Sequence, residues 1–221
     1  MKPPVPSATP TWHNDTYDAI SPNRPELSAS GKKIAIIGAG SGIGRETARA
    51  FAAAGAGHVA LLGRREALLD DTGSQVAHVN PNTFASIHVA DITQETDLKF
   101  SATMIGEWDV NTKGTFQAIK SFLPTANPSH AAVLAVTSGM ATTPAKNFVR
   151  LSSYMTSKLA QIKILEFLAL EQPHIFAATV HPGMIETDIF KKAGGDASRL
   201  PMDTGKSYIC FGGDRTLVFR I

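Results

Sequence analysis

Tyr154 and Lys158 are the two residues of this sequence whose types and spacing best suit chemistry. They stand four positions apart in a stretch with helical apolar spacing, so both side chains would project from one face of a helix. An ammonium beside a phenol favours the phenolate and lowers the tyrosine pKa from about 10 towards the range of a proton-transfer group. The pair predicts a catalytic acid or base, although an amphipathic helix can carry the same pair without any function.

Ser138 follows the apolar run of residues 131–137, which predicts a strand that delivers a hydroxyl at its carboxyl end. A hydroxyl there could hold a substrate oxygen and stabilise charge that develops on it. The helix with Tyr154 comes next in the chain. This order favours one site that contains Ser138, Tyr154 and Lys158.

A second cluster is a glycine-rich turn between the apolar residues 34–37 and a stretch of helical spacing that starts at Ile43. Gly38 suits the tight turn, Gly42 would let the backbone approach a pyrophosphate, and Gly44 would let the helix pack closely on its strand. The N–H groups of the first helical turn would then point at phosphates. The pattern predicts dinucleotide binding; a glycine turn without a ligand is the alternative.

The spacing Gly38-x-x-x-Gly42-x-Gly44 resembles the glycine loop of the short-chain dehydrogenase/reductase family. Three further stretches agree with that family, namely Asp91-Ile92, residues 154–158 and Pro182-Gly183. The resemblance implies a Rossmann-like, doubly wound parallel α/β sheet. One departure is Ile37, which stands where the family usually has a threonine, so the loop lacks a hydroxyl that would brace it.

The resemblance also implies roles for individual residues. The implied catalytic set is Asn111, Ser138, Tyr154 and Lys158, in which Asn111 would order a water relay behind Lys158. The implied cofactor-binding set is Gly38, Ser41, Gly42, Ile43, Gly44, Arg64, Arg65, Asp91, Tyr154, Lys158, Pro182, Gly183, Ile185 and Thr187.

Within that set, three residues have more specific implied contacts. Asp91 would contact the adenine amino group, although an aspartate that caps a helix would look the same. Thr187 would contact the nicotinamide amide through its side chain, and Ile185 would contact it through its backbone.

Arg64 and Arg65 stand at the exit of an expected strand over residues 58–63. An acidic residue at this position would bind the ribose 2′-hydroxyl of NAD, whereas an arginine pairs with the 2′-phosphate of NADP. The sequence therefore predicts NADP as the cofactor. Two solvated arginines that open a helix are the alternative.

The elements that must position these residues alternate along the chain. Apolar runs predict further strands at residues 83–90 and 174–180, and helical spacing predicts helices at residues 111–123 and 153–170, the latter amphipathic. Strands that alternate with helices favour parallel connections. We expect residues 131–137 to form a central strand covered on both faces.

A segment of the family pattern is missing after Asp91. The segment over residues 93–109 is short and polar, whereas the family has another buried strand and an Asn-Asn-Ala-Gly turn at this place. The pattern decays again beyond Phe190, where residues 191–206 resemble a substrate loop and no final strand is recognisable. The expected Rossmann-like sheet is therefore incomplete, without one central strand and the carboxyl-terminal strand.

The composition limits the remaining possibilities. With 221 residues, 43% of them hydrophobic and 18% charged, the chain suits one soluble domain over residues 31–221, after a proline-rich extended arm over residues 1–30. A net charge of +2 gives no reason to expect nucleic acid. The histidines and the single Cys210 form no metal-ligand spacing. The amino terminus has no apolar leader. We expect a cytoplasmic protein without membrane contact, and a homo-oligomer is possible.

These features together predict an NADP(H)-dependent oxidoreductase. It would move a hydride between the nicotinamide and a small secondary alcohol or ketone, with Tyr154 passing the proton. The amino-terminal residues resemble fungal family members, many of which serve secondary metabolism. The alternative is a truncated, catalytically impaired member that at most binds the cofactor, and the gap after Asp91 is what favours it.

Overall fold

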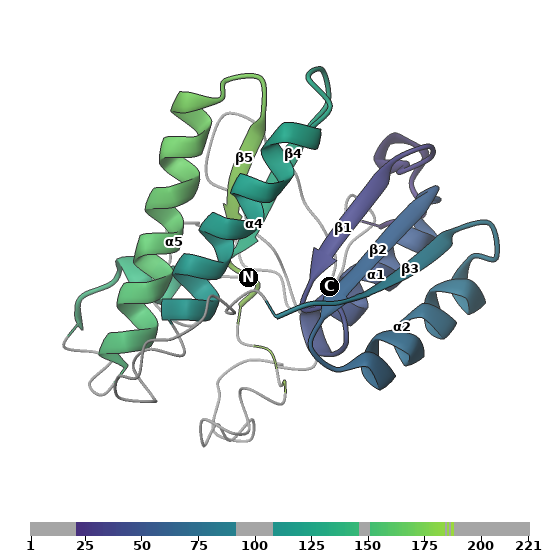
Figure 1. Cartoon of the computed structure of the whole chain (residues 1–221), viewed down its shortest axis with the longest axis horizontal. Coiled ribbons are helices and arrows are strands. Elements are labelled where there is room, and N and C mark those ends of the chain that lie inside the picture. Colours follow the sequence, from purple (N-terminus) through teal and green to yellow (C-terminus); the bar gives the residue numbers. More distant parts are fainter. Residues whose placement is uncertain (1–20, 92–107, 146–150, 184, 186, 188–221) are drawn as a thin grey trace. The chain divides into compact units, whose positions relative to one another are not determined.

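The computed structural model describes residues 21–91, 108–145, 151–183, 185 and 187, and these form two compact α/β units (Figure 1). The first unit contains the described residues up to Ala90 and those from Gly183 onward, and the second contains those from Asp91 to Pro182. All strand pairs in both units are parallel.

The first unit is a three-stranded sheet in the order β1-β2-β3, made of β1 (Lys33–Ile37), β2 (His58–Gly63) and β3 (Phe84–Val89). The helices α1 (Gly42–Ala53) and α2 (Glu66–Val79) connect successive strands. Because both crossovers run in the same direction along the sheet, α1 and α2 cover the same face, as Figure 1 shows.

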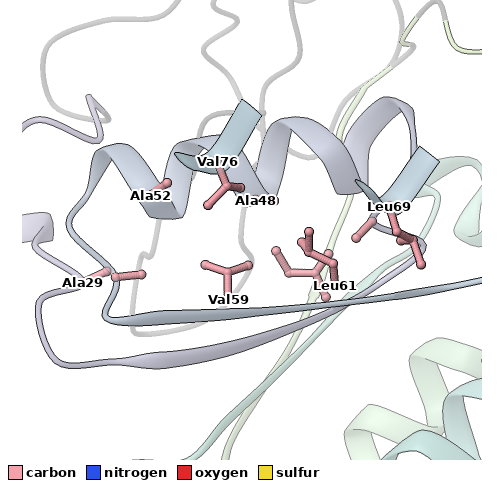
Figure 2. Packing of buried hydrophobic residues seen from close by; sticks show 10 residues of the cluster. Ala29, Ala48, Ala52, Val59, Leu61, Leu69 and Val76 are labelled. Atoms are coloured by element: carbon pink, nitrogen blue, oxygen red, sulfur yellow. The ribbon is translucent and has the colours of Figure 1, made fainter. Parts of the chain in front are cut away.

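The core of the first unit lies between this sheet face and the two helices (Figure 2). Small side chains on α1 let the helix approach β2, and larger ones on β2 and α2 fill the space between them. The fully buried members are Ala39, Ala48, Ala52, Val59, Leu61, Leu69 and Val76.

Local signals in the sequence explain how α1 ends. Gly55 has a φ of 86°, a left-handed conformation that favours glycine, and its N–H donates to the Ala52 carbonyl. Just before the sheet, Ala29 is buried and its N–H donates to the Ala54 carbonyl at 2.8 Å. Residue 29 is therefore already packed against the end of α1.

The second unit is a two-stranded sheet of β4 (Ala132–Val136) and β5 (Phe176–Val180). The helices are α4 (Gly114–Phe122), which follows a π-helical turn η3 (Asp109–Lys113), and α5 (Ser152–Glu171). Its core is smaller than that of the first unit and consists of Ile119, Ala135, Leu165 and Leu168.

Two expectations for this unit were wrong. The helix α5 is not amphipathic: Leu165 and Leu168 are buried, but apolar side chains of the same helix, among them Phe167 and Leu170, are exposed. The strand β4 is not covered on both faces, because Leu134 and Val136 are each more than a third exposed. Its apolar sequence reflects strand propensity rather than double coverage.

The strand pairing fits a missing central strand. Among the described residues, β1 pairs only with β2, and β4 pairs only with β5. The family resemblance implies a further strand between the first strand and the one that ends before Ser138. A sheet without this strand could either leave one edge of β1 unpaired or pair β1 directly with β4. Among the described strands, that edge of β1 has no partner.

The other predicted strands and helices are confirmed to within a few residues, and β2 has the predicted bounds. The predicted arm falls mostly on residues 1–20, outside the described residues, as do Cys210 and the predicted loop over residues 191–206. A single domain over residues 31–221 stays a prediction.

Candidate active site

The glycine loop joins β1 to α1 with the geometry that the glycine spacing predicts. Gly38 has a φ of 80° and Gly42 a φ of 51°, both in the left-handed region. A Cβ added at Gly44 would lie 2.2 Å from the Gly38 carbonyl oxygen. Only glycine fits at position 44, because the first turn of α1 lies directly against the end of β1.

Side chains from α1 and α2 hold the carbonyl groups of this loop. The Arg45 guanidinium donates from Nη2 to the Gly40 carbonyl at 2.8 Å and forms an ion pair with Asp71 at 3.0 Å. The Thr72 hydroxyl donates to the Ala39 carbonyl at 3.0 Å. Sequence reasoning missed these three residues, because an arginine, an aspartate and a threonine on helices carry no motif and come together only in the fold.

Arg65 lies at the carboxyl end of β2, beside the same loop. Its guanidinium donates from Nη2 to the Ser41 hydroxyl at 3.2 Å, and both Arg64 and Arg65 are exposed. The predicted basic position and the predicted phosphate loop therefore meet in the first unit.

Ile185 and Thr187 also belong to the first unit. The Thr187 methyl group lies 3.3 Å from the position of a Cβ on Gly42, and the Thr187 N–H donates to the Ile185 carbonyl at 2.9 Å. The fold thus brings this part of the predicted set to the glycine loop, although more than 140 positions separate Thr187 from Gly42 in the sequence.

The predicted catalytic residues lie in the second unit. Ser138 is buried and follows β4, and the neighbouring Thr137 N–H donates to the Val180 carbonyl of β5 at 2.7 Å. The turn η5 (Gly139–Thr142) begins directly after Ser138 and packs against α5, the helix that carries Tyr154 and Lys158.

Lys158 is held by two acceptors beside Tyr154. Its Nζ donates to the Val136 carbonyl at 2.9 Å and to the Gln161 side chain at 3.1 Å, and it lies 6.0 Å from the centroid of the Tyr154 ring. Burial lowers the pKa of Lys158 to about 8. At neutral pH the group still carries its proton for most of the time, so a positive charge stands next to the phenol.

Asn111 contacts α5 through a hydrogen bond to Ser157 rather than to Lys158. It lies in the π-helical turn η3, and its Nδ2 donates to the Ser157 hydroxyl at 3.1 Å. Gln161, which binds Lys158, in turn donates to the Thr115 hydroxyl at 2.8 Å. Sequence reasoning missed Gln161 and Thr115. The role of Asn111 in a water relay stays a prediction.

His181 ends β5 against the turn that follows Ser138. Its ring Cδ2 lies 2.8 Å from the position of a Cβ on Gly139, so a side chain at position 139 would collide with it. The Nδ1 atom is buried and has no hydrogen-bond partner among the described residues, and burial lowers the pKa of His181. Burial therefore favours the neutral form of this histidine.

The structure gathers the predicted site residues into two groups. The first unit holds Gly38, Ser41, Gly42, Ile43, Gly44, Arg64, Arg65, Gly183, Ile185 and Thr187. The second unit holds Asp91, Asn111, Ser138, Tyr154, Lys158 and Pro182.

The family model described as short chain dehydrogenase matches residues 32–108 and 97–197, well over half of the chain. The chain belongs to the short-chain dehydrogenase family. Among fungal members, short chain dehydrogenase mpl6 of Monascus purpureus is 28% identical over 247 residues, which cover 90% of this chain and 78% of that protein.

Solved structures of other family members have the same fold. One, described as a short chain dehydrogenase from Pseudomonas syringae, has a TM-score of 0.69 at 23% identity and covers 81% of this chain and 86% of that chain. A short-chain dehydrogenase from Sphingobium yanoikuyae in complex with NADPH has a TM-score of 0.62 at 20% identity, with 76% and 77% covered. The Rossmann-like α/β fold class predicted from the sequence is therefore confirmed.

The matches to this family also bear on the gap after Asp91. The alignment with the Monascus protein spans 247 positions, more than the 221 residues of this chain, so that protein has residues within the match that this chain lacks. The family model matches in two pieces that overlap at residues 97–108, close after Asp91. The first observation agrees with a shortened chain, and the second with an interruption of the family pattern in this region.

In the described part of the chain, no helix is long and apolar enough to cross a membrane. The histidine, cysteine, aspartate and glutamate side chains of the same part form no group of three or more that could hold a metal ion.

Proposed function

We propose that this short-chain dehydrogenase is an NADP(H)-dependent oxidoreductase that moves a hydride between the nicotinamide and a secondary alcohol or ketone. The observation that carries the proposal is the position of the Lys158 ammonium beside the Tyr154 ring, fixed by the Val136 carbonyl and Gln161. A small-molecule alcohol or ketone as partner and a cytoplasmic location complete the proposal.

The first unit fits the coenzyme. Gly44 lets α1 lie directly against the end of β1, and the backbone of Gly38 and Gly42 adopts the left-handed conformations that such a turn needs. The loop and the amino terminus of α1 would hold the pyrophosphate, because that helix end presents N–H groups to an anion. Thr187 and Ile185 would hold the carboxamide of the nicotinamide.

Arg65 supports NADP over NAD. Its guanidinium lies 3.2 Å from the Ser41 hydroxyl, next to the phosphate loop, and a bidentate pairing with a phosphate group suits arginine. The Sphingobium relative was solved with NADPH. We therefore assign Arg64 and Arg65 to the 2′-phosphate.

In the proposed reaction the coenzyme supplies the hydride, and this chain supplies the proton and the positioning. Ser138 holds the carbonyl oxygen of the ketone by a hydrogen bond from its hydroxyl. Tyr154 gives its hydroxyl proton to the same oxygen as the alcohol forms, and the Lys158 ammonium stabilises the phenolate that remains. In the direction of oxidation, the Tyr154 phenolate takes the proton from the alcohol.

A second candidate function is coenzyme binding without turnover. It is favoured by the pairing of the strands, because β1 has no partner other than β2 among the described residues, and by the shorter length of this chain within its match to the Monascus relative. In this case the first unit would bind NADPH, but the catalytic residues of the second unit would not be in place.

Coenzyme titration separates these possibilities. We expect NADPH to bind at least about tenfold more tightly than NADH in a fluorescence titration, since a charge-assisted phosphate contact contributes about 1.5–3 kcal/mol. A double variant with Arg64→Met and Arg65→Met should lose this preference. The control Arg24→Met removes an exposed arginine that is distant in sequence from Arg64 and Arg65, and it should keep the preference.

NADPH-dependent reduction of a panel of ketones is then followed with the same protein. Turnover supports the oxidoreductase, and tight binding without turnover supports the second candidate. Equal affinity for NADPH and NADH would contradict the assignment of the two arginines.

A further inference from the structure

Three successive residues of the glycine loop are each tied to the segment from Arg65 to Thr72. The Ala39 carbonyl accepts from Thr72, the Gly40 carbonyl accepts from Arg45, which pairs with Asp71, and the Ser41 hydroxyl accepts from Arg65. Ile37, which precedes the loop, carries no hydrogen-bonding group in its side chain. Arg65 just before α2, Asp71 and Thr72 within α2, and Arg45 of α1 therefore supply the side-chain contacts that shape this loop.

The contact between Thr72 and Ala39 lies in the interior of the first unit. Both residues are fully buried, and Thr72 shares its single hydroxyl proton between the Ala39 carbonyl at 3.0 Å and the Leu68 carbonyl of its own helix at 2.9 Å. A Cβ on Gly40 would lie 3.1 Å from the Leu68 Cβ, so α2 also packs directly against the loop. Without the hydroxyl, the buried Ala39 carbonyl would have no side-chain donor.

The ion pair between Arg45 and Asp71 fixes the next carbonyl. The Arg45 side chain is 24% exposed and that of Asp71 is 52% exposed. The Arg45 Nη2 atom lies within 3.0 Å of both the Asp71 carboxylate and the Gly40 carbonyl. Gln75 donates to the same Asp71 oxygen at 3.1 Å, which orients the carboxylate. Asp71 therefore holds the guanidinium on the loop rather than leaving it in solvent.

These contacts determine where the loop N–H groups point. In a trans peptide the C=O and N–H bonds point in opposite directions, and the described chain has no cis peptide. With the Ala39 and Gly40 carbonyls turned towards Thr72 and Arg45, the N–H groups of Gly40 and Ser41 point away from them. Among the described residues these two N–H groups have no recorded acceptor.

We propose that Asp71 and Thr72, together with Arg45, are positioning residues that hold the glycine loop in the conformation that receives the coenzyme phosphates. The inference rests on the proposed function, since it names the device that prepares the proposed coenzyme site. It assigns a binding role to a helix, α2, that carries none of the residues predicted for the cofactor.

The decisive comparison is between Asp71→Asn and Asp70→Asn. Both variants remove one negative charge at adjacent positions of α2, but no ion pair or side-chain hydrogen bond is recorded for Asp70 among the described residues. Because NADPH is an anion, electrostatics alone predicts tighter binding in both variants. We expect the opposite for Asp71→Asn, a dissociation constant raised about threefold to tenfold, and no rise for Asp70→Asn.

Thr72→Val and Ser74→Ala form a second pair. Both remove a hydroxyl that donates to a carbonyl of α2 itself, but only Thr72 also donates to the loop. We expect about threefold weaker NADPH binding for Thr72→Val and unchanged binding for Ser74→Ala.

Hydrogen exchange of the loop amides gives a readout that needs no coenzyme. In the full chain without NADPH, we expect exchange of residues 38–44 to accelerate in Asp71→Asn and Thr72→Val but not in the two controls, while exchange in β2 stays unchanged. Unchanged loop exchange would overturn the inference. Accelerated exchange with unchanged NADPH affinity would overturn it as well. A third outcome separates the two proposals. If the parent chain does not bind NADPH, but loop exchange accelerates in Asp71→Asn and Thr72→Val, the proposed function is overturned and the role of these residues in holding the loop is supported.

Discussion

Tyr154 and Lys158 show how a residue pair that is weak evidence alone gains weight from its surroundings. Lysine and tyrosine one turn apart occur on many helices. Here the lysine is held by a backbone carbonyl of β4 and by Gln161, so its charge stays near the phenol instead of moving into solvent. A fixed charge can tune a neighbouring group, whereas a mobile one is largely screened.

The role of Tyr154 is testable by removal of one oxygen atom. We expect Tyr154→Phe to lower the rate of ketone reduction by at least about a hundredfold, the usual contribution of general acid catalysis, with NADPH affinity nearly unchanged. Lys158→Met should lower both the rate and the affinity. Steady-state rates and fluorescence titrations measure the two effects. A Tyr154→Phe enzyme with near-parental rates would mean that another group donates the proton.

The buried charge of Lys158 also predicts a pH dependence of stability. Its pKa is about 8 in the folded chain, below the ordinary value of 10.5, so the unfolded chain binds more protons between these two pH values. Stability therefore rises with pH across this window, and the full penalty of burying the charge is present below pH 8.

Urea unfolding from pH 7 to about pH 10.5, the unperturbed lysine range, measures this effect. We expect the free energy of unfolding of the parent chain to rise relative to Lys158→Met across the window. Lys163→Met, which removes an exposed lysine of the same helix, is the control for the loss of a charge. A constant difference between the parent chain and Lys158→Met would contradict the expectation.

At the scale of elements, the glycine loop depends on the absence of a side chain at one position. Gly44→Ala would place a methyl group 2.2 Å from a backbone oxygen, and neither α1 nor β1 can move without disturbing the core between them. We expect a loss of about 1–3 kcal/mol in the free energy of unfolding, as for other overpacked sites. NADPH binding should be lost as well.

Gly57→Ala is the matched control for this substitution. The nearest atoms to a Cβ at position 57 lie at 3.7 Å, an ordinary contact distance. Its effect on the free energy of unfolding should stay within about 0.5 kcal/mol. Urea unfolding of both variants makes the comparison, and equal losses would show that the close packing at Gly44 is not what matters.

The sequence predicted elements better than it predicted their surroundings. Apolar runs and glycines located the strands and α1, because strand and turn signals are local. The exposure of Phe167 on α5 and of Leu134 on β4 was not predicted, since it depends on what else covers those faces. The contacts of Arg45 and Thr72 with the loop were not predicted either, because they join residues distant in sequence and leave no pattern.

At the scale of the whole molecule, the described residues form two hydrophobic cores of unequal size and two sheets. The family resemblance implies a strand after Asp91 that would give β1 a second partner, and the sequence of this chain lacks the pattern of that strand. Catalysis needs the reacting groups placed to within about 1 Å, and a misplacement of that size can cost on the order of a hundredfold in rate. We therefore expect the chain as written to be a poor catalyst.

An insertion tests this expectation. A version with a family-like strand and an Asn-Asn-Ala-Gly turn inserted after Thr93 should unfold more cooperatively and reduce ketones at least about a hundredfold faster. Urea unfolding and NADPH-dependent reduction compare the two proteins. If the chain without the insertion unfolds cooperatively and turns over at a comparable rate, the gap is harmless.

Among the described residues one edge of β1 has no partner strand, and this has a consequence for behaviour in concentrated solution. A strand edge with unpaired N–H and C=O groups is a template for a strand from another molecule, and proteins usually protect such edges with charges or a cover. Lys32 and Lys33 protect only the beginning of β1, while Ile37 at its end is exposed. The chain should therefore aggregate as its concentration rises, and light scattering should detect less of it in the protein with the inserted strand. The missing segment would then limit the solubility of the protein as well as its catalysis.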